Sequence, residues 1–357
     1  MKDKMMGFLF FLPSSKTLSY NWNFGSILGL FFFLQLFSGI LLSFYYNTDN
    51  SFDSVQYIMY DVNYGWIFRL LHFNGANFFF FFLYLHILKG LFMMSFRLLK
   101  VWCIGVTMIL FFMIIGFMGY VLVFSQMSYW AAVVIISLLS VLPYFGNFLI
   151  YFIWGSYSVI NLTVKFFFVL HFLLPWLVCF LVLIHLIILH KNGSTSILYC
   201  HGDYDKVLFF PYYWLKDLLG FMVFFFFLVY IFFFPFFLGE SEMFVECDIL
   251  KSPYHISPEW YFLFFYTILR SISNKFFGVF GMFMSICILY FLSFFWCFGN
   301  SKKSLFFLIY ICMVLTWLGL NLPEYPFLVL GQWFSFFFFF FFFLWFFFLF
   351  FLVFFFM

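Results

Sequence analysis

Residues 66–88, WIFRLLHFNGANFFFFFLYLHIL, decide the fold class of this chain. The stretch carries one charged residue, Arg69, and a helix of roughly 20 apolar residues is long enough to cross the hydrocarbon core of a bilayer. Residues 166–189, FFFVLHFLLPWLVCFLVLIHLIIL, carry no charged residue. Both stretches are therefore predicted to be transmembrane helices, and each contains two histidines in an otherwise apolar sequence.

The composition of the whole chain supports this interpretation. Of 357 residues, 67% are hydrophobic and 8% are charged, whereas a soluble domain carries about 25% charged residues. An aromatic content of 31% excludes a disordered chain. The long, unbroken apolar runs exclude a membrane β-barrel, which would show strict alternation. We therefore predict an all-α, polytopic membrane helix bundle in the lipid bilayer, and nothing in the sequence indicates a nucleic-acid partner.

Eight apolar segments separated by polar breaks are predicted to span the membrane. They lie at about 22–45, 66–88, 102–122, 166–189, 218–238, 276–298, 304–321 and 333–354. Two further segments, 127–155 and 250–272, contain prolines, so we expect short helical pieces at the interface. Most basic residues fall in alternate loops, and such loops stay on the side of insertion. Both termini are therefore predicted to lie on the inner side.

Two pairs of histidines share one spacing. His72 and His86 lie in the second predicted span, His171 and His185 lie in the fourth, and the members of each pair are fourteen residues apart. Fourteen residues make almost four helical turns and about 21 Å of rise, so both rings of a pair leave the same face of their helix. Because the two spans run parallel, we expect His72 to face His171 near the outer side. His86 is expected to face His185 near the inner side.

Facing imidazoles in an apolar bundle suit the iron of a low-spin haem, which takes one axial nitrogen from each face. Zinc would need four ligands, and no cysteine or carboxylate accompanies the histidine pairs. Arg69, three residues before His72, is a suitable cationic partner for a haem propionate. The sequence therefore predicts two haems, one above the other.

Glycines repeat the interval of the histidines. Gly25 and Gly39 lie in the first predicted span, and Gly105 and Gly119 lie in the third. Glycine lets a large flat ligand approach a helix backbone closely, so each haem is expected to meet one glycine from each of these two helices. Direct packing between helices is the other common role of such glycines.

A membrane transporter with a histidine proton relay is the main alternative, because histidines inside membranes also serve as relays. Such a protein would carry polar substrate-binding residues near the midplane or inverted repeats, and the sequence shows neither feature. A di-haem membrane reductase subunit of another family is a third possibility.

Five motifs in this chain are similar to those of one known family. They are WNFGS at 22–26, GYVL at 119–122, QMSYW at 126–130, PEWY at 258–261 and ILRS at 268–271. Together with the paired histidines, and in this order, they make the chain resemble cytochrome b, the membrane subunit of the quinol–cytochrome c reductase (bc1) complex. The poly-Phe tail carries no motif.

The resemblance implies an electron-transfer subunit with two haem b groups. The low-potential haem would be held by His72 and His171, and the high-potential haem by His86 and His185. Residues 1–210 would form a four-helix haem-binding bundle, and residues 211–357 a four-helix region with the outer quinol-site loop. The resemblance also implies a dimeric complex in the mitochondrial inner membrane, with both termini on the matrix side. Its other subunits would include a Rieske iron–sulfur protein and cytochrome c1.

Two quinone sites follow from the same resemblance. At the outer site, ubiquinol would give one electron to the Rieske protein and one to the outer haem. Glu259 is expected to accept a quinol proton, and Tyr261 and Tyr266 to line the pocket. At the inner site, a histidine and an acid can bind the two carbonyls of ubiquinone and deliver protons. The residues that match the family's inner site are His190, Ser194, Lys216 and Asp217.

Several positions depart from the family pattern. Residues 122–125 are Leu-Val-Phe-Ser where the family usually has Leu-Pro-Trp-Gly, so the wall of the outer pocket is altered. Ala131 stands where glycine is common, so outer-site methoxyacrylate inhibitors are expected to bind weakly. Lys89 replaces an arginine that often pairs with an inner haem propionate. His201 is expected to be a solvated loop residue, and His255 is assigned no role.

Overall fold

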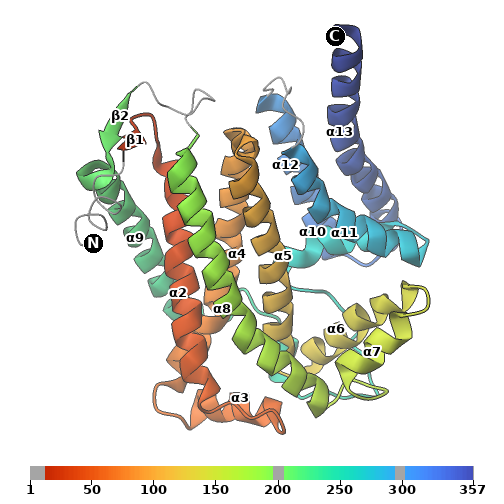
Figure 1. The fold of residues 1–357 in the computed structure, drawn as a ribbon. Helices are drawn as coiled ribbons and strands as arrows, with labels where there is room; N and C mark the ends of the chain where they lie inside the picture. Colours follow the sequence, from red (N-terminus) through yellow and green to blue (C-terminus); the bar gives the residue numbers. More distant parts are fainter. Residues whose placement is uncertain (1–12, 196–204, 294–301, 357) are drawn as a thin grey trace. The chain divides into compact units, whose positions relative to one another are not determined.

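A computed structural model describes residues 13–195, 205–293 and 302–356 (Figure 1), with backbone only at 302–304 and 344–356. His201 lies outside the described residues. Two short strands, β1 (Pro13–Ser15) and β2 (Lys206–Leu208), pair antiparallel. The α-helices are α2 (Phe24–Ser43), α3 (Ser51–Tyr60), α4 (Gly65–Phe92), α5 (Leu99–Val121), α6 (Gln126–Ser137), α7 (Gly146–Trp154), α8 (Asn161–Asn192), α9 (Phe209–Phe233), α10 (Leu263–Ser271), α11 (Lys275–Leu292), α12 (Lys302–Gly319) and α13 (Phe327–Phe356).

Six helices within the described residues are long and apolar enough to cross a membrane. They are α2 with the short helix before it, α4, α5, α8, α9 and α11. These helices overlap the first six predicted spans as far as the structure describes them, and the prediction of an all-helical, polytopic membrane bundle is confirmed. α12 and α13 lie over the seventh and eighth predicted spans, but their described apolar parts, Leu305–Gly319 and Phe327–Phe343, are shorter. Eight crossings therefore stay a prediction.

Contacts divide the chain into two compact units. The first comprises Met1–Tyr46, Asp53–Met108 and Pro175–Glu240, and the second comprises Asn47–Phe52, Ile109–Leu174 and Ser241–Met357. α5 and α8 each contribute to both units. The predicted boundary near residue 210 divides the chain by function, into a haem-binding part and a part with the outer quinol-site loop. It is not a boundary between packing units, and it stays a prediction.

Phenylalanine rings fill the core of the first unit, where α2 packs against α4 and α9. The ring of Phe31 on α2 is fully buried. Its centroid lies 5.5 Å from that of Phe82 on α4 and 5.0 Å from that of Phe224 on α9. Aromatic pairs at such distances stabilise a core beyond the area they bury. Phe33, two residues along the same helix, is 68% exposed, as a lipid-facing position requires.

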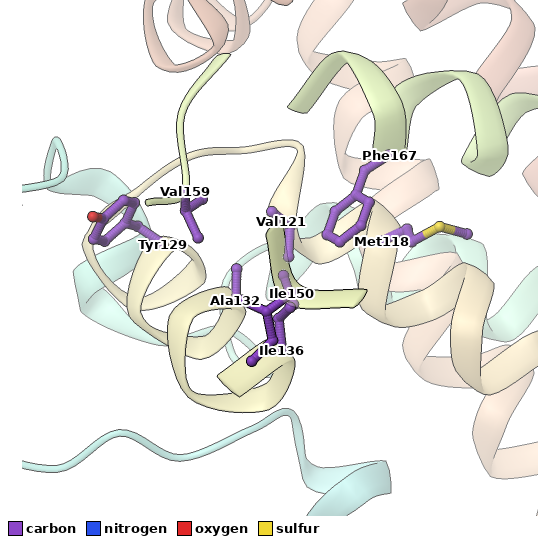
Figure 2. Close-up of a cluster of buried hydrophobic side chains, with 8 residues drawn as sticks. All are labelled: Met118, Val121, Tyr129, Ala132, Ile136, Ile150, Val159 and Phe167. Atoms are coloured by element: carbon purple, nitrogen blue, oxygen red, sulfur yellow. The ribbon is translucent and has the colours of Figure 1, made fainter. Parts of the chain in front are cut away.

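A hairpin of short helices characterises the second unit (Figure 2). α6, the 3-10 helix η3 (Leu138–Val141) and α7 occupy the predicted region 127–155, and the prediction of short helical pieces there is confirmed. Figure 2 shows that α5, α6, α7, α8 and the turn before α8 jointly contribute the buried cluster of Met118, Val121, Tyr129, Ala132, Ile136, Ile150, Val159 and Phe167. Short helical pieces also occupy 250–272, as η5 (Trp260–Phe262) and α10.

The altered segment 122–125 forms the turn from α5 to α6. Phe124 adopts a left-handed backbone with φ of 53°, and its ring packs edge-on against Tyr129 at 5.6 Å. Ser125 is the N-cap of α6, and its backbone N–H donates to Oγ of Ser128 at 2.8 Å. This is one half of a capping box. The serine that departs from the family pattern therefore starts the helix of the QMSYW motif.

Candidate functional site

The four spaced histidines lie on two long helices. His72 and His86 both lie within α4, and His171 and His185 both lie within α8. Each pair therefore sits on one continuous helix, so the predicted rise of about 21 Å between its members applies. The histidine spacing was interpreted on the assumption that both members of a pair lie on one helix, and this holds for both pairs.

Each outer histidine packs against a glycine. A methyl group at Gly39 on α2 would lie 3.0 Å from Cε1 of His72, and one at Gly119 on α5 would lie 2.5 Å from Cε1 of His171. Real Cβ atoms essentially never come as close as 2.5 Å, and a contact of 3.0 Å is tighter than most. The ring of His171 therefore leaves no room for a side chain at Gly119, and the ring of His72 leaves little at Gly39.

The inner histidines repeat this arrangement less tightly. A methyl group at Gly25 on α2 would lie 3.5 Å from Cε1 of His86, and one at Gly105 on α5 would lie 3.6 Å from Cε1 of His185. The rings of His86 and His185 are close enough to interact electrostatically. All four spaced glycines thus contact a histidine ring, and the shared interval of glycines and histidines has a structural basis.

Hydrogen bonds fix the orientation of the outer rings. Nδ1 of His171 lies 2.9 Å from the carbonyl oxygen of Ile115, and Nδ1 of His72 lies 2.9 Å from Oγ of Ser38. A carbonyl oxygen can only accept, so Nδ1 of His171 carries the proton and its Nε2 presents a lone pair. Nδ1 of His185, by contrast, is buried and makes no hydrogen bond among the described residues.

Cations near both ends of α4 contact aromatic rings. The guanidinium of Arg69 lies 5.7 Å from the centroid of Phe73. Nζ of Lys89 lies 4.5 Å from the centroid of Trp22, within the range of a cation–π interaction. The tryptophan of the WNFGS motif therefore contacts the ammonium group of Lys89, the residue that stands in place of the expected arginine.

The WNFGS motif contacts two predicted inner-site residues, Lys216 and Asp217, and the neighbour of a third, Ser194. Trp22 Nε1 donates to the carbonyl of Thr195 at 3.1 Å, next to Ser194. Asn23 Nδ2 donates to the carbonyl of Lys216 at 2.6 Å, and Ser26 Oγ donates to Oδ1 of Asp217 at 2.7 Å. One short motif thus holds both the segment after α8 and the start of α9. His190 lies on the last turn of α8, which ends before Gly193 with its φ of +75°.

The predicted outer-site residues cluster around η5 and α10. Glu259 precedes η5, and its carbonyl accepts from the N–H of Phe262 at 2.8 Å. Tyr261 is 5% exposed. The hydroxyl of Tyr266 donates to the carbonyl of Ile256 at 3.1 Å, and the guanidinium of Arg270 lies 4.9 Å from the Tyr266 ring. Backbone and ring contacts therefore fix the shape of the turn that carries Glu259.

His255 also belongs to this cluster. Its Nε2 is buried and makes no hydrogen bond among the described residues. Burial, and secondarily the nearby charge of Arg270, lower the pKa of His255 below its usual value. His255 is therefore neutral at physiological pH. The sequence analysis assigned His255 no role, and no spacing pattern could have revealed its proximity to Arg270.

Gln126 is a structural residue that the sequence analysis missed. Its Nε2 donates to the carbonyl of Lys251 at 2.6 Å, its Oε1 accepts from the N–H of Asp248 at 2.6 Å, and its own N–H donates to the carbonyl of Val245 at 2.9 Å. The start of α6 thus holds the loop that leads to Glu259. The QMSYW motif was the only signal that pointed to it.

Comparison with known proteins gives the family. A family model described as Cytochrome b/b6/petB matches residues 9–193, and one described as Cytochrome b(C-terminal)/b6/petD matches residues 246–339. The chain belongs to the cytochrome b family. Cytochrome b of Caenorhabditis briggsae is 55% identical over 336 residues, covering 92% of this chain and 91% of that protein. Cytochrome b of Apis mellifera ligustica is 46% identical over 342 residues, covering 93% and 89%.

The fold of a solved structure agrees with this assignment. A chain of a structure titled "Hyperthermophilic respiratory Complex III" superimposes with a TM-score of 0.87 at 29% identity, covering 95% of this chain and 94% of that one. Membership of the cytochrome b family implies haem b cofactors. The residues present fit such groups, because four imidazoles lie on two helices and each lies next to a glycine; a side chain at Gly39 or Gly119 would crowd the ring there.

Proposed function

We propose that this chain is the cytochrome b subunit of respiratory complex III, a quinol–cytochrome c oxidoreductase. The observation that carries the proposal is the set of four glycine–histidine contacts, at one shared interval, on a chain of this family. His72 and His171 would hold the outer, low-potential haem b, and His86 and His185 the inner, high-potential one. When bound, each haem supplies a one-electron redox centre with two imidazole ligands.

The protein supplies binding and orientation to these centres. Donation from Nδ1 of His171 to Ile115 leaves Nε2 as the ligand atom and increases the basicity of the ring. Arg69 and Lys89 are the cations assigned to the haem propionates. The neighbouring aromatic rings of Phe73 and Trp22 keep both cations near the ends of α4.

At the outer quinol site, Glu259 accepts a proton from ubiquinol and releases it to the outer aqueous side. Tyr261 and Tyr266 line the pocket. The buried ring of Tyr261 and the hydrogen bond from Tyr266 to Ile256 give the turn a fixed shape. The electrons leave by two routes in this scheme, one to a Rieske iron–sulfur protein and one to the inner side of the membrane.

At the inner quinone site, His190 and Asp217 hydrogen-bond the two carbonyls of ubiquinone and supply protons as it is reduced. Ser194 and Lys216 complete the site. The hydrogen bond from Ser26 to Asp217 is the observation that supports a fixed position for this carboxylate. Proton release outside and uptake inside would together move protons outward.

The remaining parts of the proposal rest on the family and the loop charges. Eight spans place both termini on the matrix side of the mitochondrial inner membrane, because the basic loops then face the matrix. Cytochrome c1 and a Rieske protein are the expected partner subunits in a dimeric complex.

Haem content per polypeptide, together with the reduced-minus-oxidised spectrum of the purified complex, tests the proposal. We expect two b-type haems with overlapping bands. A transporter with a histidine relay would give no such spectrum, and a single haem would contradict the paired arrangement.

A further inference from the structure

One face of α2 contacts His72 at three points. Nε2 of Gln35 donates to the backbone carbonyl of His72 at 3.0 Å, Oγ of Ser38 lies 2.9 Å from Nδ1, and Gly39 lies against Cε1. Residues 35, 38 and 39 share a helical face. This face therefore holds both the backbone and the ring of the histidine.

The direction of the bond between Ser38 and His72 follows from the other contacts of the hydroxyl. Oγ of Ser38 donates to the carbonyl of Leu34 at 2.6 Å, and a hydroxyl has one proton to give. Toward His72 the oxygen must therefore accept, so Nδ1 of His72 carries the proton. Ser38 is 0% exposed, so water does not compete for this hydrogen bond.

The residue of α2 that corresponds to Ser38 near His86 is chemically different. Fourteen residues before Ser38 stands Phe24, which precedes Gly25 as Ser38 precedes Gly39. Gly25 contacts the ring of His86 as Gly39 contacts the ring of His72. A phenylalanine ring offers no hydroxyl acceptor to an imidazole N–H. The position of α2 that offers a hydroxyl to His72 thus has no hydroxyl counterpart fourteen residues earlier.

We infer that Ser38 is a positioning residue that tunes the outer haem through His72. An acceptor at Nδ1 fixes the tautomer and makes the imidazole a stronger donor at Nε2. A stronger donor stabilises the ferric state and lowers the reduction potential, one of the ways a protein tunes haem. Ser38 therefore helps to keep the outer haem below the inner one in potential. The inference rests on the proposed function, because it requires a haem on His72.

The test is a redox titration of both b haems in the assembled complex, with haem content measured first. In Ser38→Ala we expect both haems to be retained and the lower-potential wave to move to a more positive potential, while the other wave stays in place. Ser38→Thr keeps the hydroxyl and is expected to restore the original potential. Ser43→Ala is the matched control, because Ser43 lies on the same helix and its hydroxyl donates to the backbone carbonyl of Ile40 at 2.7 Å.

Ser38→Cys covers the case in which the alanine variant does not assemble. Sulfur is a larger atom and a weaker acceptor than oxygen, so an intermediate positive shift is expected. An unchanged outer potential in Ser38→Ala or Ser38→Cys with both haems bound would overturn the role of Ser38 alone. Equal shifts of both haems would also overturn it. A wild-type complex without b haems would instead overturn the proposed function.

Discussion

Nδ1 of His171 lies 2.9 Å from the carbonyl oxygen of Ile115, four residues before the glycine that its ring contacts. One turn of α5 thus supplies both the acceptor that orients the imidazole and the space that admits it. On α2, Ser38 and Gly39 perform these two tasks for His72 from adjacent positions. A ligand ring held at two points keeps one orientation when iron binds.

Substitution of the spaced glycines is expected to have graded effects. In Gly119→Ala the new methyl carbon would lie 2.5 Å from the His171 ring, so the ring must move and outer haem content should fall. Gly105→Ala is the matched change on the same helix, where the distance of 3.6 Å is an ordinary contact. Haem per polypeptide, measured as the pyridine haemochrome, checks this. Equal losses in the two variants would contradict it.

Removal of an inner ligand is expected to affect one haem only. His86→Ala or His185→Ala should abolish the inner haem and leave the outer one, because the pairs lie about 21 Å apart along their helices. The spectrum of the purified complex should lose one of its two b-type components. His190→Ala, at a histidine on α8 that is not a proposed ligand, should keep both. Unchanged stoichiometry in the ligand variants would show that the pairing is wrong.

Glu259→Gln should slow quinol oxidation by up to about 100-fold while both haems remain, because the amide cannot accept the quinol proton. Turnover with a soluble quinol analogue and cytochrome c measures this directly. The same change at Glu324, an acid in the turn between α12 and α13, serves as the control and should leave turnover unchanged. Normal turnover of Glu259→Gln would argue against its role.

Gln126→Ala should loosen the loop from Val245 to Lys251. Two side-chain hydrogen bonds are lost, and an unsatisfied partly buried partner costs about 1–3 kcal/mol. We expect a lower unfolding temperature and faster proteolysis within this loop. Gln126→Glu keeps the acceptor for Asp248 and should fall between wild type and alanine. If the loop resists proteolysis in Gln126→Ala as well as in wild type, Gln126 does not hold it in place.

His255 should make the protein less stable in mild acid. Its pKa is lowered in the folded state by burial and by Arg270, so the unfolded chain binds a proton first as pH falls through about 6.5. Well above this pH His255 does not change the free energy of unfolding. Below it, the protein loses stability progressively. His255→Gln should therefore lose less thermal stability than wild type between about pH 7.5 and 5.5. Parallel losses in the two proteins would contradict this.

The chain's amino-acid pattern was sufficient for the helices and for the histidine and glycine intervals. Helix hydrogen bonds are local, and bilayer thickness fixes the length of a span, so both leave a periodic signal. The spans predicted at 66–88 and 166–189 correspond to α4 and α8, and the interval of fourteen placed each glycine opposite a histidine ring. Helix ends were less predictable: α9, for example, begins at Phe209, nine residues before the predicted span.

Tertiary structure alone decided which groups hold the histidines and the loops. Ser38 bonds a residue 34 positions away, Ile115 one 56 positions away, and Gln126 one 125 positions away. No periodicity records such contacts, because they depend on how two helices are rotated against each other. The same applies to Lys89 over Trp22 and to Ser26 beside Asp217. The sequence thus determined where the four spaced histidines lie, and packing determined how the rings of His72 and His171 are oriented.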